Sequence, residues 1–277
     1  MSIKKHLPIV EQFPSVHLVE YGTPQDLIVD PTHTILQSSQ WPEGRILEIA
    51  SEGTFQHFLN SQNRNYPSEL HSALKILAQP EEFISNPFSA LFETKPKSLH
   101  LRFSEPNDKA PMISKIDVFV KALGSTMITD HLRVLFEELF MNAVFDAPEE
   151  AKKMGLIDPK TQKVSEMIIA FDNDKINISC RDPYGSLNTH KLIKRMSDIE
   201  KSGTKDIINL GQKPGGAGIG CSLLHRYSSS IVVAVIPGQV TMVTCSIPLR
   251  TSLKNFLLTG KNLQIINLPI TGGNNGK

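Results

Sequence analysis

The stretch that most constrains this chain is residues 130–147, DHLRVLFEELFMNAVFDA. Apolar side chains recur there at spacings of three and four, which predicts a helix with one apolar stripe. Asp130 has the chemistry of an N-cap, and Pro148 is expected to end the helix. Glu138 and Asn142 lie four residues apart, so their side chains leave one side of the helix as neighbours. A carboxylate accepts protons and an amide oxygen binds hard cations such as Mg²⁺, although both residues can also be plainly solvated.

The charge and hydropathy of the chain exclude several classes of protein. A net charge of +1 lacks the basic excess that favours nucleic acid or an anionic membrane surface. The longest apolar run, 231–236, is too short to span a bilayer, and the first residues lack a secretory signal. The three cysteines are far apart and show no zinc-binding spacing. We therefore expect a cytoplasmic protein with reduced, buried thiols that binds neither nucleic acid nor membrane.

The pattern of residues 1–95, in which short extended runs precede helical patterns, predicts a small α/β domain. We expect this domain to have a regulatory role. The expected elements are extended runs at 16–21, 33–37 and 45–50 and helices at 67–78 and 86–92. The pattern fits a degenerate receiver-like domain, since no acidic pair for phosphoacceptor chemistry follows a first strand. The charged segment 93–97 is interpreted as a linker.

Residues 97–250 predict a second, larger α/β domain. The expected elements are a strand at 98–104, helices at 113–123 and 130–147, a loop at 148–163, a strand hairpin at 164–181, a short helix at 189–199, and a second strand hairpin at 230–247. The polar, glycine-bearing segment 200–215 is expected to be mobile. Residues 251–277 are interpreted as a C-terminal extension that ends in a disordered tail.

Three features follow one another along this domain, and each has a use in nucleotide binding. Glu138 and Asn142 on a helix offer a base and a Mg²⁺ ligand. Asp182, at the end of a strand, offers an acceptor for an exocyclic amine such as that of adenine. Before the next helix, the glycines that would let backbone N–H groups approach phosphates are Gly216, Gly218 and Gly220. Alone, each glycine turn is as readily an ordinary tight turn; together the three features are more specific.

With these motifs, residues 97–250 resemble the Bergerat-fold (GHKL) ATPases, which include histidine-kinase catalytic domains, the gyrase B subunit and anti-sigma-factor serine kinases. The first motif is ELFMNA at 138–143, the second DPYG at 182–185 and the third GGAGIG at 215–220. The strand–helix–helix entry is most similar to the anti-sigma-factor kinases. The resemblance implies a two-layer α/β sandwich with a mixed sheet, with ATP bound between the layers under a mobile lid at 186–214.

The resemblance also implies a role for each residue that matches the motifs. Glu138 would be catalytic, and Asn142 would hold Mg²⁺ at the phosphates of ATP. The remaining nucleotide-binding positions would be Asp182, Gly185, Gly216, Gly218, Gly220 and Thr241, with Thr241 supporting the adenine-binding Asp182. The implied function is a serine/threonine protein kinase of the partner-switching type in bacterial signalling. Its partner would be a sigma factor or an anti-anti-sigma-like protein, and family members are commonly homodimers.

Two alternatives stay open. In DPYG the glycine stands one position later than in the family pattern D-x-G-x-G, and Tyr184 occupies the place of a small residue. This departure favours a non-catalytic regulatory module that binds its partner with or without nucleotide. A histidine kinase would need a phosphoaccepting histidine on a long dimerising helix, and neither His100 nor His131 lies in such a sequence.

Overall fold

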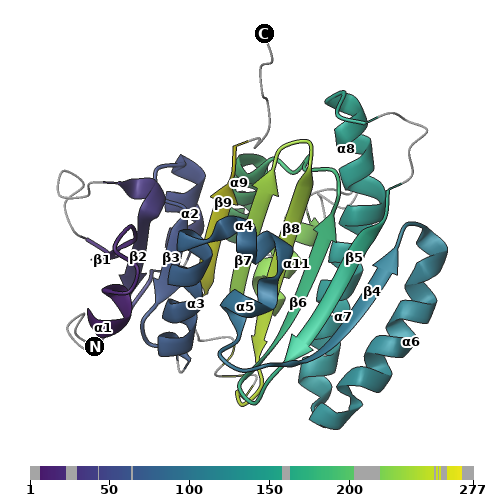
Figure 1. The fold of residues 1–277 in the computed structure, drawn as a ribbon, viewed down its shortest axis with the longest axis horizontal. Helices are drawn as coiled ribbons and strands as arrows, with labels where there is room; N and C mark the ends of the chain where they lie inside the picture. Colours follow the sequence, from purple (N-terminus) through teal and green to yellow (C-terminus); the bar gives the residue numbers. More distant parts are fainter. Residues whose placement is uncertain are drawn as a thin grey trace.

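The computed structural model describes residues 7–22, 30–42, 44–63, 65–157, 163–202, 219–252, 254, 256 and 261–269. The strands in these ranges form one mixed nine-stranded sheet in the order β1-β2-β3-β9-β7-β8-β6-β5-β4 (Figure 1). The strands are β1 (His17–Glu20), β2 (Thr34–Ser38), β3 (His57–Asn60), β4 (Lys97–Phe103), β5 (Ser165–Phe171), β6 (Lys175–Asp182), β7 (Ser230–Ile236), β8 (Val240–Pro248) and β9 (Asn262–Asn267). The chain is therefore an α/β protein, as predicted.

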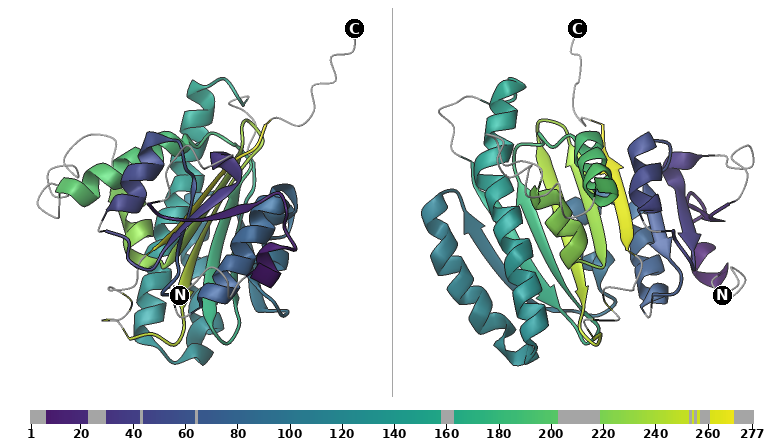
Figure 2. Two further views of the ribbon diagram at one scale, coloured as in Figure 1. Left: turned by 90° about the vertical axis from the view of Figure 1, so that its left-hand side faces the viewer. Right: turned by 180° about the vertical axis from the view of Figure 1, so that it is seen from behind.

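Helices cover both faces of this sheet (Figure 2). One face carries α2 (Arg45–Glu52), α6 (Lys109–Val120), α7 (Thr126–Met141), α9 (Thr189–Ser202) and α11 (Ile219–Tyr227). The other face carries α3 (Tyr66–Ala78), α4 (Pro80–Ser85) and α5 (Pro87–Leu91), with the short α1 (Leu7–Val10) near α3. Strands such as β5 are apolar on both sides because each side meets a helical layer; Ile169 packs toward α7 and Ala170 toward α4 and α5.

The longest predicted helix starts earlier than expected. Its N-cap is Ser125, whose hydroxyl accepts the N–H of Ile128, so the predicted cap Asp130 lies inside the first turns of α7. Asp130 was chosen because it directly precedes the apolar stripe, but Ser125 is a cap of equal chemistry one turn earlier.

The helix also does not end at Pro148. A π-helical turn, η6 (Asn142–Asp146), follows α7 and leads into α8 (Ala147–Lys153), so the predicted loop at 148–163 is wrong for its first part. In η6 the N–H of Ala147 donates to the carbonyl of Asn142, five residues back. Pro148 then falls in the first turn of α8, directly after the π-turn. Acidic residues begin α8 and lysines end it, as the helix dipole favours.

The first 95 residues contain more helix than predicted. Residues 45–50, expected to be extended, form α2, which is bracketed by Gly44 and Gly53 in the left-handed conformation. Its apolar residues bury one side of the helix, and α3 and α5 confirm the helices predicted at 67–78 and 86–92. Both β3 and α4 were not predicted; Pro80 starts α4 instead of only ending α3. We call β1–β3 with α2–α5 the N-terminal unit.

Strand β9 joins this unit to the rest of the chain. It lies in the predicted C-terminal extension 251–277, yet it pairs antiparallel with β3 and parallel with β7. One sheet therefore continues from the N-terminal unit into the strands of residues 97–250, across the predicted linker. The predicted disordered tail lies outside the described residues from 270 onward.

The larger predicted domain has the expected elements. β4 is an edge strand, α6 covers most of the predicted helix at 113–123, and β5–β6 and β7–β8 form the two antiparallel hairpins. All three cysteines are free and buried. Within the described ranges, no helix is both long enough and apolar enough to cross a bilayer.

A buried ion pair connects the N-terminal unit to β6. The Lys175 ammonium lies 3.1 Å from Glu69 Oε1, with side-chain exposures of 4% and 11%. The amide of Asn262 in β9 donates to the other oxygen of Glu69 at 3.4 Å. Because buried charges need partners, this pair specifies how α3 sits on the sheet.

We expect Glu69→Ala to lower the free energy of unfolding by about 3–5 kcal/mol, because it leaves the Lys175 charge buried without a counterion. Urea denaturation measures the change. Glu149→Ala removes the acid of an exposed pair with Lys153 and should leave stability unchanged. Equal losses in both variants would contradict the structural importance of the buried pair.

Candidate functional site

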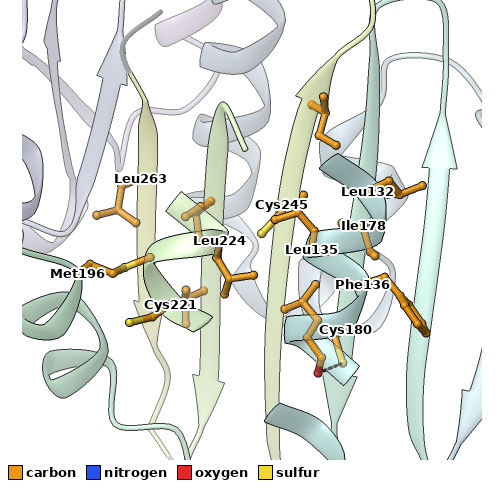
Figure 3. Packing of buried hydrophobic residues seen from close by; sticks show 14 of the residues in the cluster. Leu132, Leu135, Phe136, Ile178, Cys180, Met196, Cys221, Leu224, Cys245 and Leu263 are labelled. Atoms are coloured by element: carbon orange, nitrogen blue, oxygen red, sulfur yellow. Dashed lines mark hydrogen bonds between the residues drawn. The ribbon is translucent and has the colours of Figure 1, made fainter. Parts of the chain in front are cut away.

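The packing of α7 places Glu138 and Asn142 at its flank. Leu132, Leu135 and Phe136 point from α7 into the core over β6 and β8 (Figure 3). Glu138 is half-buried, and this burial raises the pKa of its carboxyl; Glu137 and Asp146 raise it further, while Lys109 lowers it. Asn142 is the first residue of the π-turn η6. Such turns occur frequently at functional sites.

The start of α11 rests on the Glu138 carboxylate. A Cβ atom on Gly220 would lie less than 3.0 Å from Glu138 Oε2, a distance that real Cβ atoms do not adopt. Only glycine therefore permits this approach without moving Glu138. The third predicted motif thus meets the first at Gly220; Gly216 and Gly218 lie outside the described residues.

Asp182 ends β6 with its carboxyl buried. Its Oδ1 accepts the N–H of Tyr184 at 3.0 Å. Burial raises the pKa of Asp182 to about 6, although the N–H groups of Tyr184 and Gly185 and the hydroxyl of Thr241 favour the ionised form. A buried acceptor at a strand end is what recognition of an amine donor requires.

Thr241 supports Asp182 from the neighbouring strand. The two residues lie directly opposite each other in the β6–β8 pair, and Thr241 is also buried. Its hydroxyl is near enough to lower the pKa of Asp182, yet among the described residues Oγ1 has no partner at full hydrogen-bond geometry. A buried hydroxyl in this condition fits a site that a polar ligand or a water completes.

Gly185 wedges the turn after Asp182 against the β7–β8 hairpin. Its φ is +58°, and an added Cβ would lie less than 3.0 Å from backbone atoms of Ile236, Gly238 and Gln239. The N–H of Gly238 donates to the Gly185 carbonyl at 3.1 Å. The backbone conformation and the close approach of the hairpin therefore both require a glycine at this position, which explains why the glycine of DPYG is at residue 185.

Two hydrogen bonds hold the Asp182 turn against the α7–η6–α8 helix. Cys180 Sγ donates to the Leu139 carbonyl at 3.7 Å (Figure 3). Ser186 Oγ donates to the Ala147 carbonyl at 2.8 Å. Together with the contact of Gly220 on Glu138, they bring the three predicted motifs to one end of α7.

Tyr184 occupies interior space beside Asp182. Only 6% of Tyr184 is exposed, and burial raises the pKa of its phenol. The Lys163 ammonium lies 5.5 Å from the ring centroid and donates to the Pro183 carbonyl at 2.9 Å. The space beside Asp182 is thus packed with an aromatic ring and a cation.

Part of the predicted lid is a packed helix. Residues 189–202 form α9, confirming the predicted helix at 189–199, and Ile193, Met196 and Ile199 are buried in the main core. The mobile lid predicted at 186–214 is therefore wrong for these residues, because their apolar side has a helix and sheet to pack on. The segment from 203 to 218 lies outside the described residues.

Sequence reasoning missed Arg195. Burial raises the pKa of both Asp146 and Cys221, and the charge of Arg195, which is exposed on α9, partly offsets each rise. Arg195 therefore lies beside the end of α7 and the start of α11. A lone arginine on a polar helix side carries no local signal of such a position. His100 lies on β4, and His131 is buried on α7 against the rings of Tyr227 and Phe256.

Within the described ranges, no three His, Cys, Asp or Glu side chains gather as a metal site. Mg²⁺ that binds substrate phosphates needs only one or two protein oxygens, and the Asn142 amide would supply one.

Neither the scan against protein-family models nor the search of curated proteins returned a match.

We expect the two glycines to respond differently to alanine. Gly185→Ala should cost about 2–4 kcal/mol of unfolding free energy, because a positive φ and a clash with backbone both penalise the methyl group. Gly220→Ala lies at the start of α11 and meets only the flexible end of Glu138, so its stability should change little. Urea denaturation compares them; similar losses in both variants would contradict the structure at one of the two contacts.

The raised pKa of Asp182 predicts how stability depends on pH. The folded protein holds this proton more tightly than the unfolded chain, since the pKa moves from 3.8 to about 6. Its contribution is present below pH 3.8 and is lost as the pH rises through about 6. Between about pH 4 and pH 7, wild type should lose about 2 kcal/mol relative to Asp182→Asn. Denaturation at several pH values measures this difference, and parallel curves for both proteins would disprove the burial effect.

Proposed function

We propose that the chain binds ATP at the end of α7 and acts as a serine/threonine protein kinase of the anti-sigma-factor, partner-switching type. The observation that supports it is the convergence of Glu138, Asp182 and Gly220 from motifs that are far apart in sequence. The proposal includes the finer fold, the two-layer Bergerat sandwich, for residues 97–250. Its support is the layer of α6, α7 and α11 on one face of β4–β8.

The binding roles follow from the chemistry of each side chain. Asp182 would accept a hydrogen bond from the adenine amine, and with a pKa of about 6 it is mostly ionised at neutral pH. The Thr241 hydroxyl would add a second polar group beside the base. The first turn of α11, which starts at the glycine-rich motif, would present backbone N–H groups to phosphate oxygens. Asn142 would hold Mg²⁺ with its amide oxygen.

Glu138 is the residue proposed to carry the chemistry. ATP supplies the γ-phosphoryl group when bound. As the hydroxyl oxygen of a partner's serine or threonine bonds to the γ-phosphorus, the bond from that phosphorus to the β,γ-bridging oxygen would break and ADP would leave, while Glu138 would take the hydroxyl proton. The half-buried position raises the pKa of Glu138, and a base whose pKa approaches the working pH transfers protons most effectively.

The partner in this proposal is a protein, either a sigma factor or an anti-anti-sigma-like regulator. Met141 and Phe145 flank Asn142 in sequence and are 42% and 44% exposed. Large apolar side chains beside the site would contact a docked protein better than a small polar substrate. A cytoplasmic location and a homodimer belong to the same proposal.

A second candidate is a regulatory module that binds its partner without phosphate transfer, with or without nucleotide. The buried ring of Tyr184 and the Lys163 ammonium over it favour this candidate, since they take up space beside Asp182. The two candidates predict the same partner class and differ in nucleotide binding and turnover.

We expect Mg²⁺ with ATP to raise the melting temperature of wild type, equivalent to about 2.7 kcal/mol at a hundredfold excess over Kd. Asp182→Ala should abolish the shift. Glu138→Gln should keep the shift and lose ATP turnover, measured as ADP release, whereas Glu82→Gln on α4 should behave as wild type.

The outcomes separate the candidates. Binding without turnover in wild type would favour the non-catalytic module. The absence of a shift at millimolar nucleotide would contradict ATP binding altogether. Turnover that survives in Asn142→Ala would rule out the role of that amide at Mg²⁺.

A further inference from the structure

Helix α9 is tied at both ends to residues beyond the proposed site. At its start, Thr189 Oγ1 donates to Asn267 Oδ1 of β9 at 3.2 Å. At its last turn, Lys201 Nζ donates to Glu48 Oε1 of α2 at 3.3 Å. The position of α9 is therefore linked directly to the N-terminal unit.

Apolar packing reinforces this link. α2 and α9 lie side by side on one face of the sheet (Figure 2). Their inward side chains belong to one core cluster: Ile46, Leu47, Ile49 and Ala50 from α2 and Ile193, Met196 and Ile199 from α9. The backbone of Gly44 also approaches Glu200, whose Cγ would lie 3.5 Å from an added Cβ. Since packed interiors transmit displacement, the two helices cannot move independently.

The other side of α9 reaches the proposed site. Met196 points toward Cys221 and Leu224 of α11 (Figure 3). Cys221 directly follows Gly220, which rests on the Glu138 carboxylate. A shift of α9 would therefore displace α11 and, through Gly220, the Glu138 side chain.

Contacts also run from α2 into the N-terminal unit. Arg45 donates to Glu48 and, through Nε, to the Tyr21 hydroxyl at 3.1 Å. The ring centroids of Tyr21 and Trp41 lie 4.7 Å apart. Trp41 Nε1 donates to the Leu59 carbonyl of β3 at 2.9 Å. Trp41 is the only tryptophan of the chain, so its fluorescence reports on this unit alone.

We propose that the N-terminal unit regulates nucleotide binding at the proposed site through the contact between α2 and α9. This inference rests on the proposed function, because it assigns a regulator to the same site. Coupling between two sites is reciprocal: a unit that changes nucleotide affinity is itself changed when nucleotide binds. The Glu48 and Lys201 side chains are 36% and 59% exposed, so their ion pair contributes little energy to the contact between α2 and α9. Apolar packing provides most of that energy.

The test uses the full chain with Mg²⁺ and ADP as the probe. Calorimetry measures binding, and Trp41 emission should change along the same titration. Glu48→Lys places like charges opposite Lys201 and Arg45 and should weaken binding by about two- to fivefold, the range of an exposed ion pair, and reduce the Trp41 response. The reversed pair, Glu48→Lys with Lys201→Glu, should restore part of both, because it rebuilds the ion pair to α9 and leaves Arg45 beside a like charge. Glu52→Lys makes the same charge change at an exposed position of α2 and is the matched control.

The results that overturn the coupling differ from those that overturn the function. If wild type binds ADP with no change in Trp41 emission, and Glu48→Lys binds as tightly as Glu52→Lys, the coupling is wrong and the nucleotide site stands. If wild type binds no ADP, the proposed function fails, and amide hydrogen exchange decides the coupling. Faster exchange in α9 and α11 of Glu48→Lys than of Glu52→Lys supports the coupling, and equal exchange overturns it.

Discussion

The packing of α7 on β6 and β8 is the interaction on which the site depends. Leu132, Leu135 and Phe136 insert into the core between helix and sheet, and this fixes the rotation of the helix about its own axis. Glu138 must then lie at the flank, half out of water, where the start of α11 reaches it. Because a close-packed core allows no rotation, hydrophobic side chains determine where the polar groups of the site point.

Two glycines, which have no side chain, are as important for the geometry of the site as its polar residues. Gly185 allows a backbone approach to the β7–β8 hairpin that any Cβ would block, and Gly220 allows an approach to Glu138 that a Cβ would permit only if the Glu138 side chain moved. Each approach lies beside a carboxyl group, that of Asp182 and that of Glu138. Burial is the largest cause of the raised pKa of both carboxyls. The same physical effect, loss of water, thus acts on both carboxyl groups.

The secondary-structure predictions that were wrong share one cause. Each relied on a local sequence pattern, whereas tertiary packing decided the structure. Residues 45–50 combine a short apolar run with flanking turn residues, a pattern that strands and short helices share; packing against α9 makes them helical. Pro148 normally ends a helix, but the π-turn before it moves the hydrogen bonding by one residue. The strand β9 follows a segment without clear periodicity, and only its neighbours β3 and β7 make it part of the sheet.

The sequence by itself determined the elements with sustained periodicity: α3, α7, and the hairpins β5–β6 and β7–β8. It also determined the chemistry of the candidate residues and their order along the chain, since both are local properties. Only the tertiary structure decided that Gly220 meets Glu138, that Thr241 faces Asp182 and that α2 holds α9. These contacts join residues far apart in sequence, and no local pattern encodes them, because they arise when separate apolar surfaces pack into one core.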